Sequence, residues 1–132
     1  RKYNFHIIYA HKAPPAGNLL IINKFISAYK LWDNFKNHFS KKYKYLVIKI
    51  DVLFIDILEL FFAASKLTKE QKSPSLNKAS GRLDILKFFF QFAWDLKILE
   101  TKKYILIGKE LAETGKMLGN WLKSVGKQTP PE

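Results

Sequence analysis

Apolar residues recur at spacings of three and four along four stretches of the sequence, and this pattern predicts four amphipathic helices. We place them at residues 19–39, 44–66, 76–99 and 101–125. In the first and third helices the apolar positions are Ile22, Phe25, Tyr29, Trp32, Phe35 and Phe39, then Leu83, Leu86, Phe90 and Ala93. In the second they are Leu46, Ile50, Leu53, Ile57, Leu60 and Ala64, with Ile48, Ile55 and Phe62 widening the stripe. In the fourth they are Tyr104, Ile107, Leu111, Leu118, Leu122 and Val125.

Proline-containing or polar segments separate these stretches. Residues 1–17 form an N-terminal extension that we cannot assign, and Asn18 is a suitable cap for the first helix. Pro74 breaks the chain ahead of the third helix, for which Ser75 is a plausible cap, and Thr101 is a capping residue for the fourth. Residues 127–132 form a tail. Because short connections make antiparallel neighbours, we predict an all-α, up-down four-helix bundle over residues 18–126.

Small residues line the fourth helix immediately beside its apolar face. They are Gly108, Ala112, Gly115 and Gly119. Each glycine within a helix costs about 0.5–1 kcal/mol relative to alanine, so their repeated use predicts a close approach by another helix. Two explanations remain open: tight packing on a neighbour within the bundle, or an interface between subunits.

The charge of the chain favours polyanionic partners. Lysine and arginine outnumber aspartate and glutamate by 23 to 11, which gives a net charge of +12. On the far side of the fourth helix, lysines recur at every seventh position: Lys102, Lys109, Lys116 and Lys123. A helix drifts by only about 20° per heptad, so these four side chains point in similar directions. A solvated surface is the usual explanation for such a run, but on this protein the column favours binding of nucleic-acid phosphates.

Two further basic groups are candidates for phosphate contact. Lys41, Lys42 and Lys44 alternate with Tyr43 and Tyr45 between the first two helices, a mixture that suits phosphate contact and base stacking. We slightly prefer the alternative that these tyrosines anchor the turn to the end of the bundle. Lys78 and Arg82, four residues apart, form a third possible clamp at the start of the third helix.

The sequence carries no recognisable catalytic or metal-binding motif. It has no cysteine, and its three histidines form no ligand pair at helical spacing. We therefore expect a non-enzyme without a cofactor or metal. No run reaches the roughly 18 apolar residues of a membrane span, and we expect a cytoplasmic protein. Met117 is the only methionine, so we expect a processed form, a fragment or an upstream-extended reading frame.

Residues 75–125 resemble a known family, the accessory variability proteins (Avd) of diversity-generating retroelements, within the four-helix-bundle proteins encoded in 23S rRNA intervening sequences. The most telling segment runs from Gly115 to Leu122 and includes Trp121; the second runs from Leu83 to Leu99. Overall the resemblance covers residues 19–126. Basic residues are common in the family at the positions of Lys87 and Gln91, and Val47 stands where members often have glycine.

The resemblance implies a non-catalytic bundle that assembles into a pentameric barrel. It also implies binding to the element's reverse transcriptase and to nucleic acid, including the template RNA, in support of mutagenic retrohoming. The small residues and Trp121 would then serve helix packing or a subunit interface, and the lysines the nucleic acid, with Lys87 a further contact. The first alternative is an intervening-sequence-type scaffold for protein–protein interaction. A membrane-surface binder ranks last, because the apolar faces are needed for the core.

Overall fold

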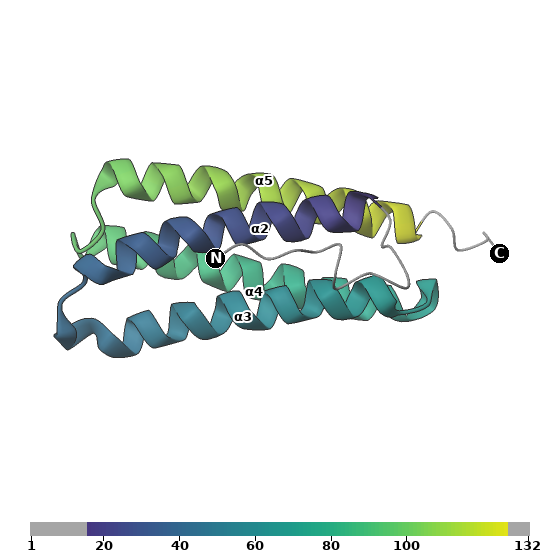
Figure 1. The fold of residues 1–132 in the computed structure, drawn as a ribbon, viewed down its shortest axis with the longest axis horizontal. Helices are drawn as coiled ribbons and strands as arrows, with labels where there is room; N and C mark the ends of the chain where they lie inside the picture. Colours follow the sequence, from purple (N-terminus) through teal and green to yellow (C-terminus); the bar gives the residue numbers. More distant parts are fainter. Residues whose placement is uncertain (1–15, 127–132) are drawn as a thin grey trace.

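The computed structural model describes residues 16–126, and within them the chain is helical (Figure 1). Its elements are α2 (Ala16–Phe35), η1 (Lys36–His38), η2 (Lys41–Tyr43), α3 (Lys44–Lys66), α4 (Lys69–Asp95) and α5 (Thr101–Gly126). No strand occurs in this range. The predicted tail and nearly all of the predicted N-terminal extension lie outside the described residues.

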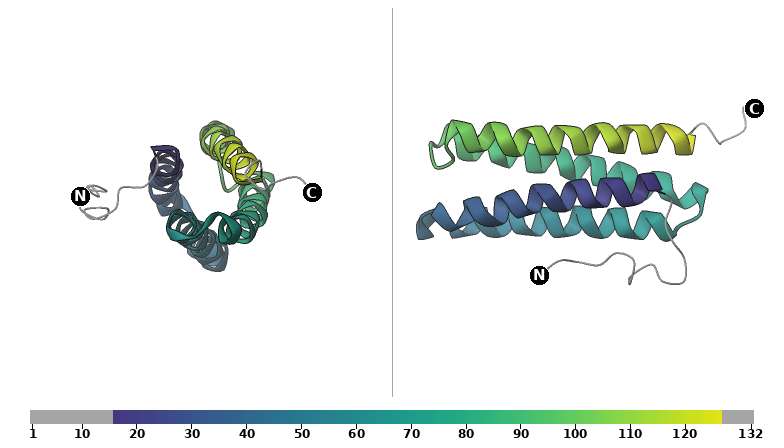
Figure 2. Two further views of the ribbon diagram at one scale, coloured as in Figure 1. Left: turned by 90° about the vertical axis from the view of Figure 1, so that its right-hand side faces the viewer. Right: turned by 45° about the horizontal axis from the view of Figure 1, so that its top comes forward.

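The four long helices run alternately up and down and pack against one another in chain order around a common core (Figures 1 and 2). Each contacts the next along the chain, and α5 contacts α2, which closes the bundle. The predicted all-α four-helix fold is therefore confirmed. The η1–η2 connection and the α4–α5 turn lie at one end, and the α3–α4 turn lies at the other.

The core is built mainly from the predicted apolar faces, to which α3 adds Phe54 and Phe61, two buried residues that the prediction did not include. Its largest fully buried side chains are Trp32, Phe25, Phe54, Phe61 and Phe90. Their rings meet edge to face or tilted: Trp32 and Phe90 are 5.4 Å apart between centroids, and Phe25 and Phe54 are 5.1 Å apart. Such pairs contribute about 0.5–1.5 kcal/mol each beyond the burial of area. In α5, Ile107, Leu111, Leu118 and Val125 are buried as predicted.

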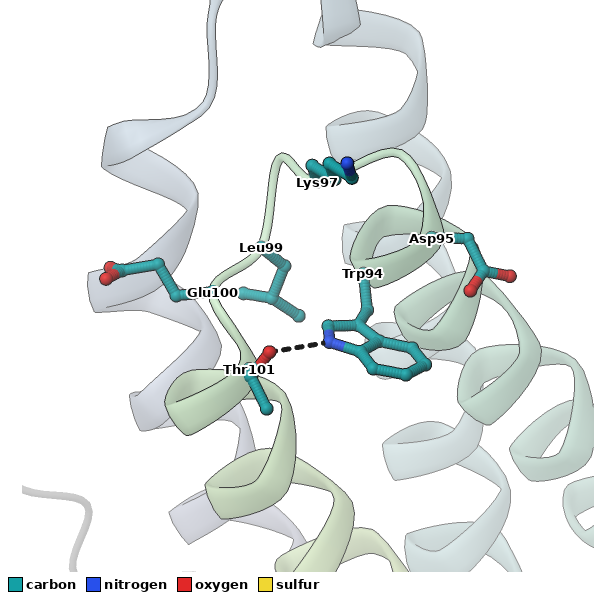
Figure 3. A pocket seen from close by; sticks show the side chains of 6 residues that line it. All are labelled: Trp94, Asp95, Lys97, Leu99, Glu100 and Thr101. Atoms are coloured by element: carbon teal, nitrogen blue, oxygen red, sulfur yellow. Dashed lines mark hydrogen bonds between the residues drawn. The ribbon is translucent and has the colours of Figure 1, made fainter.

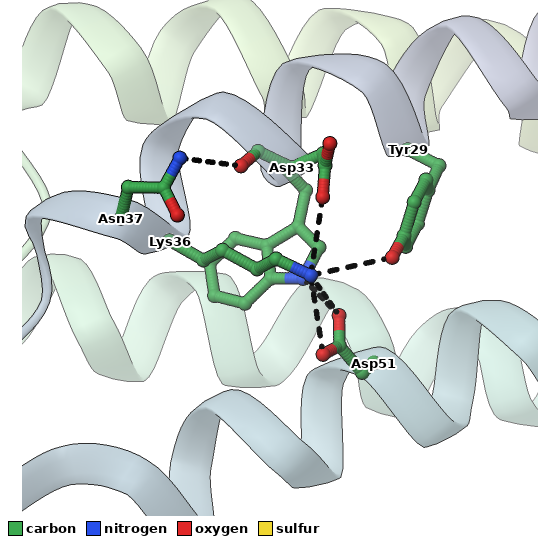
Figure 4. A network of polar contacts seen from close by, with 6 residues as sticks. Tyr29, Asp33, Lys36, Asn37 and Asp51 are labelled. Atoms are coloured by element: carbon green, nitrogen blue, oxygen red, sulfur yellow. Dashed lines mark hydrogen bonds and ion pairs between the residues drawn. The ribbon is translucent and has the colours of Figure 1, made fainter. Parts of the chain in front are cut away.

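A polar network joins α2 to α3 at the edge of this core (Figure 4). The buried indole of Trp32 donates from Nε1 to Asp51 Oδ1 at 2.8 Å. Lys36 Nζ lies 3.4 Å from both oxygens of Asp51, 3.3 Å from Tyr29 Oη and 3.2 Å from Asp33 Oδ1. Burial lowers the pKa of Lys36, but the hydrogen bonds and charges around it raise the pKa more, so it stays above its usual value. The network therefore holds a charged lysine between the two helices.

The start of α4 differs from the prediction. Helix α4 begins at Lys69 rather than at residue 76, because Thr68 and Gln71 form a reciprocal capping box. Pro74 lies inside the helix, where it removes one backbone donor close to the N-terminus. Ser75 is not a cap: its hydroxyl donates to the carbonyl of Leu60 on α3, at 3.4 Å. Similarly, α2 begins at Ala16, so the predicted cap Asn18 lies within its first turn rather than ahead of it.

The prediction that Ile48, Ile55 and Phe62 widen the buried stripe of α3 is wrong. These side chains are 52%, 56% and 40% exposed, respectively. The core covers only one face of each helix, and these residues, spaced by seven, share the opposite face. Ile85, Phe88 and Phe92 are likewise exposed on α4. The bundle thus carries apolar side chains on the outer faces of both helices.

The turn from α4 to α5 is closed by a Schellman motif. Helix α4 ends at Asp95, not at residue 99, and Lys97 adopts the left-handed conformation with a φ of 62°. The amide of Ile98 donates to the carbonyl of Ala93 at 3.1 Å, and that of Lys97 to the carbonyl of Trp94 at 2.9 Å. Thr101 is the first residue of α5, and its hydroxyl accepts a hydrogen bond from the indole of Trp94.

Candidate nucleic-acid interface

The lysine column of α5, which comprises Lys102, Lys109, Lys116 and Lys123, lies entirely on an exposed face. None of the four makes an ion pair within residues 16–126. The opposite face of the same helix supplies Ile107, Leu111 and Leu118 to the core, which fixes the direction in which the lysines point. The helix spans roughly 30 Å between the first and last lysine.

The acidic residues of α5 are turned toward α2. Lys24 on α2 forms ion pairs with Glu110, at 3.2 Å, and with Glu113. The hydrogen bond from Lys24 lowers the pKa of Glu113, and the nearby charge of Lys109 lowers this pKa further. The hydrogen bond to Glu113 also raises the pKa of Lys24 despite its partial desolvation. The single ammonium of Lys24 therefore compensates part of the charge of the two carboxylates from a neighbouring helix, and Lys109 is the column lysine that also acts on Glu113.

The second predicted basic group lies at the end of the bundle that also holds the α4–α5 turn (Figure 1). Lys41, Lys42 and Lys44 are exposed. The ammonium groups of Lys42 and Lys44 lie 5.2 Å from the ring centroids of Tyr43 and Tyr45, respectively. Tyr45 is 76% exposed, so the preferred prediction that it anchors the turn is wrong. Tyr43 is half-buried.

The third predicted group does not form a free pair. Arg82 Nε lies 3.7 Å from Asp56 Oδ2, so its side chain reaches across to α3 rather than toward α5. Lys78 is exposed and makes no ion pair in the described part of the chain. Arg82 therefore faces α3 and not the lysine column of α5.

The small residues of α5 are in different surroundings. A Cβ added at Gly115 would lie 3.1 Å from Lys87 Nζ and 3.7 Å from Leu83 Cδ2, so α4 packs closely there. A Cβ at Gly108 or Gly119 would meet nothing within 4 Å. Ala112 is exposed, whereas Trp121 is half-buried and packs on Phe61 with 6.5 Å between ring centroids. Packing within the bundle therefore accounts for Gly115 but not for Gly108 or Gly119.

Sequence reasoning missed two residues at the α4–α5 turn, Trp94 and Lys97. Trp94 stacks on Tyr104, with 4.9 Å between ring centroids and 9° between ring planes, and Lys97 is exposed beside it. The exposure of Trp94 could not be recognised from the sequence, since an apolar residue near the end of a helix is usually expected to be buried in the core. The left-handed lysine had no sequence signal, because glycine usually occupies that position.

The described residues contain neither a candidate metal site nor a candidate membrane span. No group of three or more histidine, aspartate or glutamate side chains could hold a metal ion in residues 16–126. No helix in the same range has the length and apolar character needed to cross a membrane. Comparison of the chain with protein-family models and with curated protein sequences finds no match.

Proposed function

We propose that this protein is a non-catalytic adaptor that binds nucleic acid through the phosphates, using the lysine column of α5. The observation that carries the proposal is that all four lysines are exposed and lack an ion pair in the described residues. An unpaired surface cation binds phosphate without first breaking an ion pair, and it releases the counterions condensed on the polymer. Because phosphate contacts carry no base information, binding is largely independent of sequence.

The wider role that we propose is that of an accessory protein of a diversity-generating retroelement. In this role it brings the reverse transcriptase together with template RNA and DNA, and several copies form a ring, a pentamer by resemblance to the Avd family. Support comes from the motif between Gly115 and Leu122 and from the four-helix fold. A Cβ at Gly108 or Gly119 would have no neighbour within 4 Å in the described part of the chain, which leaves room for a helix of another subunit.

A second candidate is a scaffold for protein–protein interaction, as in intervening-sequence-type bundles. It is favoured by the exposed apolar residues on the outer faces of two helices, Ile48, Val52 and Ile55 on α3 and Ile85, Phe88 and Phe92 on α4. Exposed apolar patches of this kind mark interaction surfaces. Both candidates predict a protein partner, but only the adaptor predicts salt-dependent binding to nucleic acid.

The test is a salt titration of binding to a labelled duplex DNA and a labelled structured RNA, followed by fluorescence anisotropy. Four phosphate contacts to duplex DNA predict a slope of about −3.6 for log K against log salt, at about −0.9 per contact. A slope shallower than that of a single contact, or no binding at low salt, would overturn the adaptor and favour the scaffold. Co-purification with a reverse transcriptase encoded beside this gene then tests the wider role.

A further inference from the structure

The α4–α5 turn contains an open cavity of about 460 Å³. Its walls are formed by Trp94, Asp95, Lys97, Leu99, Glu100 and Thr101 (Figure 3). The cavity lies at the end of α5 where the lysine column begins with Lys102. Thr101, which lines the cavity, directly precedes Lys102 in the sequence.

The wall includes a fixed aromatic platform. The indole of Trp94 is held on one face by the ring of Tyr104 and at its edge by the 3.0 Å hydrogen bond from Nε1 to Thr101 Oγ1. Trp94 is 37% exposed and borders the cavity, whereas Tyr104 does not. A ring held at two points loses little conformational freedom when a planar ligand stacks on it. Base–aromatic stacking is also the usual means of binding single-stranded nucleic acid.

Acidic side chains form part of the cavity wall, and two exposed lysines lie in or beside it. Asp95 and Glu100 are part of the wall, and carboxylates repel phosphate but accept hydrogen bonds from base N–H groups. Glu100 is already paired with Lys103 at 3.2 Å. Lys97 and Lys102 are exposed and make no ion pair in residues 16–126, so they are available to the phosphates on either side.

Lys97, in the cavity wall, has a left-handed backbone conformation. This conformation closes the Schellman motif at the end of α4, where glycine is the usual residue. The chain places a lysine there instead, in the wall of the cavity.

We infer that the α4–α5 turn binds an unpaired nucleobase of a single strand, which stacks on Trp94 while Lys97 and Lys102 contact the flanking phosphates. This inference rests on the proposed function, since it adds a single-strand site to the duplex-binding surface of α5. A competing occupant is a basic side chain of a protein partner, drawn by the indole and the carboxylates. The exposed Lys97 in the cavity wall, with the exposed Lys102 next in sequence to Thr101, disfavours it.

Intrinsic tryptophan fluorescence gives the direct test of stacking on Trp94. Of the other two tryptophans, Trp32 is fully buried and Trp121 is half-buried against Phe61, so a ligand in the cavity should quench mainly Trp94. In a Trp121→Phe background, a 12-nucleotide oligo(rA) is titrated at low salt, with oligo(dA) and a 12-base-pair duplex in parallel. Either single strand should quench the fluorescence, and the duplex should bind with little quenching. The comparison of the two single strands tells whether the ribose contributes.

Variants complete the test. Trp94→Ala should weaken oligo(rA) binding about tenfold and leave duplex binding within about twofold, while Trp94→Phe, which keeps a ring, should retain most of the affinity. Circular dichroism checks that both variants remain helical. If Trp94→Ala does not fold, quenching in the parent chain and in Trp94→Phe still shows whether a single strand stacks at position 94.

The possible failures are distinct. Single-strand binding without quenching and without an effect of Trp94→Ala would overturn this inference and leave the α5 column intact. Quenching by an oligo-arginine peptide but not by oligo(rA) would overturn it in favour of a protein partner. Absence of binding to every nucleic acid at low salt would overturn the proposed function and, with it, this site.

Discussion

Trp32 and Asp51 are joined by the shortest side-chain hydrogen bond between α2 and α3, 2.8 Å from indole Nε1 to carboxylate Oδ1. The indole is completely buried, so the aspartate satisfies a donor that water does not reach. The same carboxylate faces the ammonium of Lys36. One acidic side chain thus satisfies both a buried donor and a partly buried cation.

Asp51→Ala should lower the free energy of unfolding by about 2–3 kcal/mol, because it leaves the indole donor unsatisfied and removes a partner from Lys36. Urea denaturation followed by circular dichroism measures the change. Asp33→Ala is the matched control: Asp33 also pairs with Lys36, but from three residues earlier in the chain and with a largely exposed side chain, and its loss should cost less than about 1 kcal/mol. Equal losses in the two variants would contradict the role given to Trp32.

The ion pair between Lys24 and Glu113 predicts a pH dependence. The hydrogen bond from Lys24 lowers the pKa of Glu113 below its usual 4.5. The ionised carboxylate therefore stabilises the fold above pH 4.5, and this contribution is lost as the pH falls through the lower pKa of the folded state.

NMR titration of the Glu113 side-chain carboxyl carbon should show Lys24→Met moving the midpoint back up toward 4.5. Lys30→Met is the control, since Lys30 is exposed on the same helix and makes no ion pair within the described range. An unchanged midpoint in Lys24→Met would show that the pair does not persist in solution.

Lys97→Gly should raise the free energy of unfolding by about 0.5–1 kcal/mol, because glycine adopts the left-handed conformation without strain but costs more chain entropy on folding. Lys97→Ala keeps the Cβ and should give no such gain. Thermal and urea denaturation of the two variants measure the difference. A gain of the same size from alanine would assign the effect to the lost charge rather than to the backbone.

Gly108→Ala and Gly119→Ala distinguish the two explanations of the small residues on α5. An added Cβ meets nothing within 4 Å among residues 16–126 at either position, so each change should stabilise a single chain by about 0.5–1 kcal/mol. Sedimentation velocity measures assembly in parallel. If the double variant becomes more stable but loses its oligomeric state, these glycines lie at a subunit interface; a gain in stability with unchanged mass would exclude that role.

Lys109→Glu with Lys116→Glu should weaken duplex binding at least about tenfold and make the salt slope shallower by about 1.8, the contribution of two phosphate contacts. Lys30→Glu with Lys49→Glu changes the net charge equally, on exposed positions of α2 and α3. Anisotropy titrations compare the two double variants. Equal losses would mean that overall charge, and not the α5 column, determines binding.

The core was predictable because burial in a bundle repeats every three or four residues. The positions of α5, from Ile107 to Val125, follow this rule directly. The rule does not say how much of a helix's circumference is buried, so Ile48 and Ile55 were wrongly expected to face the core. The start of α4 was missed because Pro74 suggests a break, whereas the capping box of Thr68 and Gln71 forms one turn earlier.

The candidate site was predictable only in part. The regular spacing of the α5 lysines follows from the sequence, since one helix determines their common direction. Whether a basic side chain is unpaired depends on whether an acidic side chain of another helix lies beside it. Asp56 on α3 pairs with Arg82 on α4, and Lys24 on α2 pairs with the acids of α5. These contacts join residues 26 or more positions apart, so no local pattern reveals them.

If a duplex lies along the lysine column as we propose, the length of α5 sets the size of the segment that one chain contacts. Lys102 and Lys123 are separated by roughly 30 Å of straight helix, which corresponds to about nine base pairs of duplex. A duplex of six base pairs would reach only part of the column, and its affinity would fall stepwise as each lysine loses its phosphate. Longer polymers would gain no further contact from one chain. Neighbouring copies, each covering about one helical turn, would then space themselves along the nucleic acid by the length of a single helix.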